Sequence, residues 1–243
     1  KEELGVLVMF DLKIVNGLVY DGDGGEPREQ NVAIRDGLIA EIGECKGDAA
    51  REIDAQGCIV TPGFIDLHTH YDGQVSWDET LQPSINHGVS TVVMGSCGVG
   101  FAPVREDDRD KLIRLMEGVE DIPGSALAEG LTWDWESLPE YMDALDAKPH
   151  SIDFAVQVTH DPLRVFVMGD RAIHEEEASA ADIEEMRRLT REALEAGAIG
   201  FSTGRSDVHR SADGEWTPSS EATAEELAGI ASAMDGIDHG ILQ

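Results

Sequence analysis

The chain of 243 residues carries 49 acidic and 18 basic side chains, which gives a formal net charge of -31 at pH 7. A negative surplus of this size opposes binding to nucleic acid or to an anionic membrane surface. No stretch approaches the ~18 apolar residues of a membrane span, and the start of the chain lacks the apolar core of a secretory signal. We therefore expect a cytoplasmic protein that binds neither nucleic acid nor membranes.

Short apolar segments separated by turn dipeptides make up the first sixty residues. Asn16-Gly17 and Asp36-Gly37 each lie between two such segments. Both dipeptides are strong signals for a β-hairpin. A few short strands are too small a unit to be stable alone. Residues 1–57 are therefore predicted to form part of a small β-sandwich domain, whose other strands would lie C-terminal to this chain.

From residue 58 onward, apolar strands alternate with helical stretches, a pattern typical of parallel strands joined by crossover helices. Residues 58–243 are predicted to be the first half of an α/β fold, a (β/α)8 barrel of TIM type. A barrel of this kind needs eight strands to close, so we expect the natural protein to be longer. The predicted strands cover residues 59–68, 90–97, 152–160 and 198–203, and a fifth strand starts at residue 240. The predicted helices cover residues 180–196 and 223–234. The first of these helices has Ser179 as its N-cap, and Gly197 ends it.

The segment from residue 105 to residue 149 is longer than a simple crossover. It contains Trp133, Trp135 and Tyr141 between acidic residues. Long connections in compact domains either carry function, for example as lids over a pocket, or fold into structure of their own. We expect an insertion here that forms a lid or packs against the outer helices of the barrel.

Two histidines, His68 and His70, lie at the end of the strand predicted over residues 59–68. Side chains at i and i+2 of a strand point to the same face, and the carboxyl ends of barrel strands carry active sites. Two neutral imidazole nitrogens there can bind one cation at about 2.0–2.1 Å, the distance that zinc prefers. A histidine pair can also be a surface or core feature, but the Pro-Gly turn in the same strand favours a metal site.

The three cysteines are odd in number and irregular in spacing, which does not indicate a disulfide framework. Cys97 ends the strand predicted over residues 90–97 and enters a glycine-rich turn, where small neighbours leave its sulfur accessible. A thiolate binds zinc at about 2.3 Å and can bridge two metals. Cys45 and Cys58 are interpreted as small buried hydrophobic residues. The predicted metal ligands are therefore His68, His70 and Cys97.

These motifs make the chain similar to the amidohydrolase superfamily and, within it, to the N-acyl-D-amino-acid deacylases, also called D-aminoacylases. The resemblance covers nearly all of residues 11–243. It rests on three motifs in a fixed order, namely residues 62–66 leading into His68-Thr69-His70, the turn at residues 95–103 around Cys97, and residues 197–204.

The resemblance implies a barrel capped by a β-sandwich, with one or two zinc ions and a cysteine in place of the carboxylated lysine of other superfamily members. The positions of the five lysines are consistent with a cysteine in this role, because none of them lies at the C-terminal end of a predicted barrel strand. It also implies that metal-bound hydroxide hydrolyses the linear amide of a small N-acyl-D-amino acid, with an aspartate as proton shuttle. That aspartate and two more histidine ligands would lie beyond Gln243, so residues 1–243 alone are expected to be inactive.

Three other residues at strand ends are candidates for substrate binding. His160 matches a recurring position of the family, although a hydrogen bond that shapes its loop would also explain it. Ser202 and Arg205 end the fourth predicted strand, and Arg205 could pair with a substrate carboxylate or form an ordinary surface salt bridge. His209 lies in a polar loop and is assigned no role.

Two other functions stay open at the level of the sequence. Another amide or cyclic-amide hydrolase, of hydantoinase or dihydroorotase type, could use the same scaffold, because a fold does not fix a substrate. A truncated, non-catalytic relative could instead act as an interaction protein.

Overall fold

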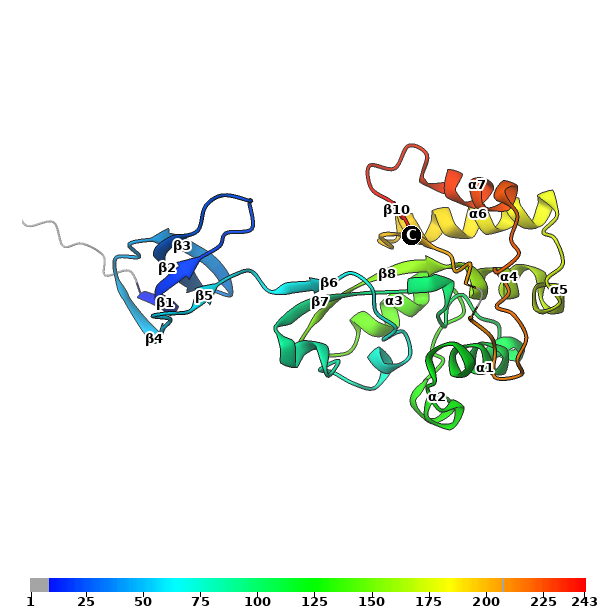
Figure 1. Ribbon diagram of the computed structural model, residues 1–243, viewed down its shortest axis with the longest axis horizontal. Helices are drawn as coiled ribbons and strands as arrows, with labels where there is room; N and C mark the ends of the chain where they lie inside the picture. The colour runs from blue at the N-terminus through cyan, green and yellow to red at the C-terminus, as the bar shows by residue number, and fades with distance from the viewer. Residues whose placement is uncertain (1–8, 207) are drawn as a thin grey trace, which may run out of the picture. The chain divides into compact units, whose positions relative to one another are not determined.

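The computed structural model describes residues 9–206 and 208–243 (Figure 1). The chain divides into two compact units, Lys1–Gly63 and Phe64–Gln243, and the described residues of each unit form one five-stranded sheet. The boundary lies at Gly63 rather than at the predicted residue 57. The reason is that β5 (Ile59–Val60) pairs in parallel with β1 (Met9–Val19) and so belongs to the smaller unit.

The smaller unit is a mixed sheet in the order β3-β2-β1-β4, with β5 also paired to β1. The predicted turn at Asp36-Gly37 is confirmed, because both residues have positive φ angles and Arg35 pairs with Leu38 across the turn. The other strands of this sheet are β2 (Arg28–Arg35), β3 (Leu38–Gly43) and β4 (Asp48–Asp54), the last of which was not predicted.

The predicted hairpin at Asn16-Gly17 is wrong, because β1 runs through this position as one strand. The register of β1 against β2 shifts between Ile14 and Gly17, which identifies a β-bulge. On its other edge, β1 pairs with β4 up to Val15 and with β5 from Leu18 onward. Strand partners on both edges keep the chain extended, so a dipeptide that often makes a turn makes a bulge here.

The cysteines of the smaller unit differ in burial. Cys45 packs with Phe10 and Ala33 in a small core, as predicted for a buried hydrophobic residue. Cys58 is exposed, so the same interpretation is wrong for Cys58. Its carbonyl oxygen accepts a hydrogen bond from the Leu18 amide, which satisfies the backbone while the side chain faces solvent.

The larger unit is built on a parallel sheet, whose described strands follow one another in the order β6-β7-β8-β9-β10. Sequential parallel strands joined by helices have the topology of a (β/α) barrel. Four of the strands end one to three residues earlier than predicted, so His68, Cys97 and His160 lie just after their strands. The strands are β6 (Phe64–Asp66), β7 (Val89–Met94), β8 (Asp153–Thr159), β9 (Gly200–Ser202) and β10 (Ile241–Leu242).

The helices of the larger unit include the two that the sequence predicts. In α6 the Ser179 hydroxyl accepts a hydrogen bond from the Asp182 amide, while the Asp182 carboxylate accepts one from the Ser179 amide. Gly197 follows the helix with a φ of 119°, as expected for a stop. The helices are α1 (Arg109–Glu120), α2 (Gly124–Gly130), α3 (Leu138–Asp146), α4 (His160–Met168), α5 (Asp170–Ile173), α6 (Ala180–Glu195) and α7 (Ala224–Ala231).

The segment at residues 105–149 forms α1, α2 and α3 and packs into the main hydrophobic core. The Trp135 indole nitrogen donates a hydrogen bond to the Phe101 carbonyl oxygen at 2.9 Å. The Tyr141 hydroxyl donates one to the Asp72 carbonyl oxygen at 2.7 Å. Both side chains are buried, so this segment is a packed layer of the larger unit.

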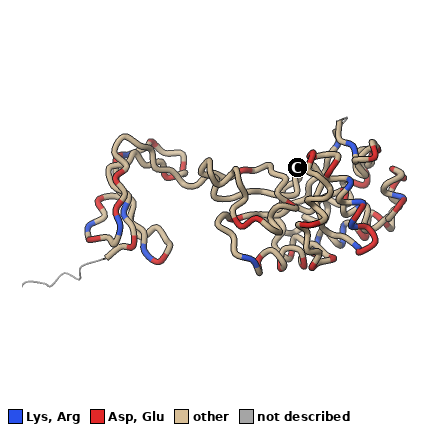
Figure 2. Tube along the Cα trace, turned by 90° about the horizontal axis from the view of Figure 1, so that it is seen from below, with Lys and Arg blue, Asp and Glu red and all other residues tan. Residues whose placement is uncertain are grey.

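The acidic surplus is distributed along the chain rather than confined to one segment. Figure 2 shows Asp and Glu positions, in red, in both units. Among the residues that the structure describes, no helix is long and apolar enough to cross a membrane.

Candidate metal centre

The predicted ligands His68, His70 and Cys97 converge beyond the C-terminal ends of β6 and β7. One potential ligand atom from each residue lies within 4.8 Å of the other two. The Cys97 Sγ atom is 3.3 Å from the His68 Nε2 atom. β6 and β7 are parallel neighbours, so their carboxyl ends deliver residues that are 29 positions apart to one place.

Thr69 fixes the segment that carries the two histidines. Its backbone amide and its hydroxyl both donate hydrogen bonds to the Val93 carbonyl oxygen, at 3.0 and 2.7 Å. The Thr69 side chain is buried, whereas His68 on one side is exposed and His70 on the other is half-buried. The tie to β7 therefore holds the backbone of the pair against the neighbouring strand.

The turn around Cys97 has an unusual backbone that depends on two glycines. Cys97 itself has a φ of 55°, and Gly98 has a φ of 76°. The Gly98 amide donates a hydrogen bond to the Ser202 hydroxyl at 2.9 Å. A Cβ atom at Gly204 would lie only 2.1 Å from the Cys97 carbonyl oxygen. The cysteine is thus held in a left-handed conformation by direct backbone packing against the residues that follow β9.

The His70 imidazole is neutral at pH 7. Burial, which is the largest cause, and the neighbouring charges of His68 and His209 together lower its pKa to about 4. A neutral imidazole has a lone pair that can bind a metal. His70 is therefore in the protonation state that a metal ligand requires.

Without a cation the Cys97 thiol stays protonated. Burial raises its pKa, and the negative charges of Glu120 and Asp161 add to this effect. A dication favours the thiolate strongly and so reverses this balance. The site is therefore suited to a sulfur that ionises when the metal binds.

The donor atoms fit a zinc-type cation. An ion bound tetrahedrally at about 2.0–2.1 Å from nitrogen and about 2.3 Å from sulfur holds those two atoms about 3.5 Å apart. The separation of the His68 nitrogen and the Cys97 sulfur, 3.3 Å, is close to this value. Among the described residues, the His70 Nδ1 atom is buried without a hydrogen-bonding partner. Two nitrogens and one sulfur that converge in this way can hold a divalent metal.

Sequence reasoning missed three side chains beside the cluster. The Glu120 carboxylate is 3.4 Å from the His70 Nε2 atom, and the Gln243 amide nitrogen is 3.1 Å from the His68 Nδ1 atom. His209, which was assigned no role, is near enough for its charge to lower the pKa of His70. None of the three lies in a motif that could have identified it.

The three candidate substrate-binding residues occupy different environments. His160 is fully buried, with Nδ1 at 2.8 Å from the Thr203 hydroxyl and Nε2 at 2.9 Å from the Glu226 carboxylate. Because an ionised carboxylate only accepts, Nε2 carries the proton and Nδ1 accepts from Thr203. Neither nitrogen of His160 is left for a ligand. Ser202 is also buried and accepts from the Gly98 amide, whereas Arg205 is exposed.

Glu226 joins His160 to a buried ion pair. Both of its carboxylate oxygens accept hydrogen bonds from the Arg164 guanidinium, at 2.8 and 2.7 Å, and neither side chain is appreciably exposed. The Arg164 guanidinium also donates to the Glu176 carbonyl oxygen at 2.6 Å. We call His160, Thr203, Arg164 and Glu226 the buried clamp, since they tie α4 and α7 to the end of β9.

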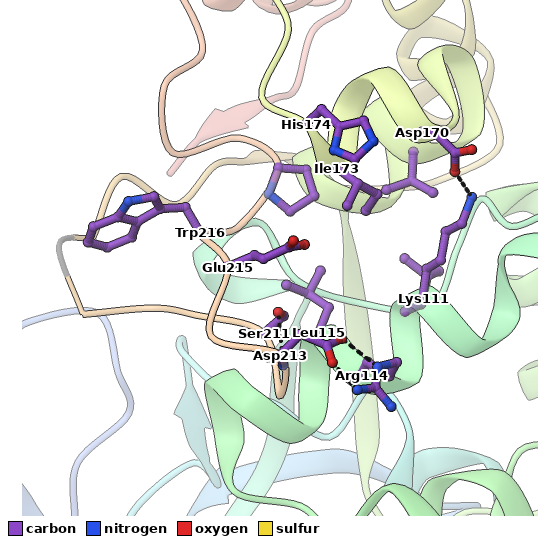
Figure 3. A pocket seen from close by; sticks show the side chains of 13 residues that line it. Lys111, Arg114, Leu115, Asp170, Ile173, His174, Ser211, Asp213, Glu215 and Trp216 are labelled. Atoms are coloured by element: carbon purple, nitrogen blue, oxygen red, sulfur yellow. Dashed lines mark hydrogen bonds and ion pairs between the residues drawn. The ribbon is translucent and has the colours of Figure 1, made fainter.

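A separate cavity of about 130 Å³ lies between α1, α4, α5 and residues 211–218 (Figure 3). Figure 3 shows two ion pairs at its edge, Lys111 with Asp170 and Arg114 with Asp213. None of the three predicted metal ligands lines it. In each pair the two opposite charges compensate each other. The cavity is therefore a site separate from the metal centre.

Comparisons with known proteins agree with this architecture. The profile described as "Amidohydrolase family" matches residues 51–239. A D-aminoacylase of Alcaligenes xylosoxydans xylosoxydans is 35% identical over 95% of this chain and 43% of its own length. An N-acyl-D-glutamate deacylase of the same organism is 36% identical over 91% of this chain and 41% of its own length. The chain thus spans less than half the length of these relatives.

Solved structures with the same fold include a D-aminoacylase variant in complex with CuCl2, with a TM-score of 0.77 and 32% identity over 96% of this chain and 44% of that chain. Another is an N-acyl-D-glutamate deacylase from Bordetella bronchiseptica, complexed with zinc and a phosphonate inhibitor. Its TM-score is 0.72, with 33% identity over 97% of this chain and 45% of that chain. The parallel sheet, the smaller mixed sheet and the profile match lead to one conclusion: the chain belongs to the amidohydrolase family.

Proposed function

We propose that the full-length protein is a zinc-dependent hydrolase that cleaves the linear amide bond of N-acyl-D-amino acids. The observation that carries this proposal is the convergence of His68, His70 and Cys97 at the carboxyl end of a parallel sheet. The substrate class is supported by the similarity to D-aminoacylase and to N-acyl-D-glutamate deacylase.

A zinc ion held by these three residues would polarise the amide carbonyl and activate water for attack on it. The chain's own residues prepare the site for that ion. His70 is neutral at pH 7 because burial lowers its pKa to about 4, so no proton has to leave it before the metal binds. The Cys97 turn is held from outside by Ser202 and Gly204, which keeps the sulfur near His68.

Among the three candidate substrate-binding residues, Arg205 is the one we assign to the substrate. Its side chain is exposed and lines a hollow of about 210 Å³, together with Ser206, Trp216, Ser220 and Glu221. A guanidinium binds the carboxylate of an amino acid through paired hydrogen bonds. His160 and Ser202 are buried and occupied by protein contacts, so we assign them to support of the neighbouring turns.

The test is elemental analysis and hydrolysis assays on the full-length protein, with Cys97→Ala and the matched control Cys58→Ala. Cys58 is exposed and is not one of the three converging residues, so its loss removes a thiol and leaves the three predicted ligands in place. We expect zinc and hydrolysis of N-acetyl-D-amino acids in the wild type and the control, and loss of both in Cys97→Ala.

Three results would count against the proposal in different ways. Turnover that persists in Cys97→Ala would exclude the proposed centre. Hydrolysis of hydantoins in preference to N-acyl-D-amino acids would move the assignment to a cyclic-amide hydrolase. Absence of zinc and of turnover in the wild type would favour a non-catalytic interaction protein.

A further inference from the structure

Glu120 is a carboxylate beside the cluster that no motif identifies. It is the last residue of α1, and its Oε1 atom lies 3.4 Å from the His70 Nε2 atom. Its side chain is only 22% exposed. Among the described residues, the side chain that lies against Glu120 is the His70 imidazole, which is charged only when protonated, and no lysine or arginine pairs with Glu120. A largely buried carboxylate without a cationic partner is costly, and a bound cation would remove that cost.

The position of Glu120 is fixed by the packing of its helix. α1 buries Leu112, Leu115 and Met116 in the main core. On another side, the backbone of residues 210–212 packs against α1 so closely that a Cβ atom at Gly118 would lie 2.2 Å from the Arg210 carbonyl oxygen. The helix therefore presents Glu120 from a rigid element, as an orienting group requires.

A second buried carboxyl group, that of Asp72, follows His70 by two residues. Asp72 is 2% exposed, and its Oδ2 atom has no hydrogen-bonding partner among the described residues. Two acidic side chains, Glu120 and Asp72, thus accompany the cluster, and their negative charge would favour a dication bound there.

We infer that Glu120 belongs to the metal centre as a positioning residue, which contacts His70 and strengthens the binding of a divalent cation by its negative charge. This inference rests on the metal centre proposed above. Carboxylates that contact a metal-bound histidine fix its ring orientation and increase its basicity. Their loss typically lowers metal affinity by about 10–100-fold.

The experiment is a zinc titration of the full-length protein, stripped with a chelator and measured in competition with a chromophoric chelator. It compares the wild type with Glu120→Gln and with the matched control Asp121→Asn. Asp121 is the neighbouring residue, and it has a left-handed φ of 55°, which asparagine adopts readily. Both variants remove one negative charge from the same helix end, but only Glu120 contacts His70.

We expect Glu120→Gln to lower zinc affinity by about 10–100-fold and Asp121→Asn to change it less than threefold. Glu120→Asp, which keeps the charge, should recover part of the loss. In cobalt-substituted protein at saturating metal, the sulfur-to-cobalt absorption band should persist in Glu120→Gln, because Cys97 is unchanged. Unfolding in urea at the same midpoint as the wild type would show that the variant is folded.

Equal zinc affinities of Glu120→Gln and Asp121→Asn would overturn the inference and leave the metal centre standing. A wild type that binds neither zinc nor cobalt would instead overturn the metal centre itself. The two failures are therefore distinguishable in one set of titrations.

Discussion

Two groups of polar side chains lie beyond the carboxyl ends of neighbouring strands in the parallel sheet, and they differ in how completely they are paired. The metal cluster follows β6 and β7, and the buried clamp surrounds the ends of β8 and β9. Each group contains histidine. In the buried clamp both nitrogens of His160 have protein partners. In the metal cluster His70 Nδ1 is buried without one, and His68, whose nitrogens lie near Cys97 and Gln243, is exposed to solvent.

The comparison separates residues that serve the scaffold from residues that are available to a ligand. A buried polar group stabilises the fold only when its hydrogen bonds are made within the protein. A polar group that leaves a bond unmade is costly to folding, and a ligand can recover that cost. Position at a strand end therefore does not decide function by itself; the pairing of the side chain does. The following predictions test this distinction.

The largest effect is expected from Arg164→Met in the buried clamp. This change leaves the fully buried Glu226 carboxylate without its cation, which should lower the free energy of unfolding by about 3–5 kcal/mol. Urea unfolding measures the loss. The control is Arg187→Met, which breaks an exposed pair with Glu184 and should cost less than about 1 kcal/mol. Similar losses in the two variants would show that the clamp does not hold the fold.

The next effect concerns the pH dependence contributed by Asp161. Burial raises its pKa to about 7, against an ordinary value of 3.8. Between these values the folded protein holds a proton that the unfolded chain has lost, so stability falls as the pH rises from about 4 to about 7. The contribution is at most about 4 kcal/mol.

Asp161→Asn removes this ionisation and keeps an oxygen that can accept from the Ser219 amide, which bonds to Asp161 at 2.6 Å. The variant should therefore gain stability relative to the wild type as the pH rises across that range. Urea unfolding at pH 5, 6, 7 and 8 measures the difference. Parallel pH profiles for the two proteins would contradict the raised pKa.

A pair of histidine substitutions tests the comparison directly. His68→Ala removes an exposed side chain, so it should leave the stability of the metal-free protein within about 1 kcal/mol. The zinc affinity of this variant should fall more than about 100-fold, because even residues that contact a metal-binding side chain without binding the metal contribute about 10–100-fold. His160→Ala should do the reverse, lowering stability while the folded protein keeps its zinc affinity. If only His160→Ala lost zinc affinity, the roles would be reversed, with His160 binding the metal and His68 not.

The smallest effect is expected where the two regions touch. Gly204→Ala places a methyl group 2.1 Å from the Cys97 carbonyl oxygen, so the turn must shift. We expect a loss of about 1–2 kcal/mol in unfolding free energy and a measurable fall in zinc affinity. Gly25→Ala is the control, because nothing lies within 4 Å of a Cβ atom there. Unchanged zinc affinity in Gly204→Ala would show that the turn tolerates displacement.

Local signals in the sequence determined several elements without help from the fold. Helix α6 is predictable because its N-cap, Ser179, and the glycine that ends it, Gly197, are local signals next to the helix in the sequence. The hairpin at Asp36-Gly37 was predicted for the same reason. The convergence of His68, His70 and Cys97 was also predictable, since the ends of adjacent parallel strands must meet.

Only the tertiary structure decided which polar residues are satisfied. His160 meets Thr203 and Glu226, which are 43 and 66 positions away in the sequence. Glu120 meets His70 because packing of α1 against the core brings its last turn there. Asn16-Gly17 became a bulge because strands pair with β1 on both edges. Capping and turn signals act within a few residues, whereas these outcomes depend on partners that the chain meets only when it is folded.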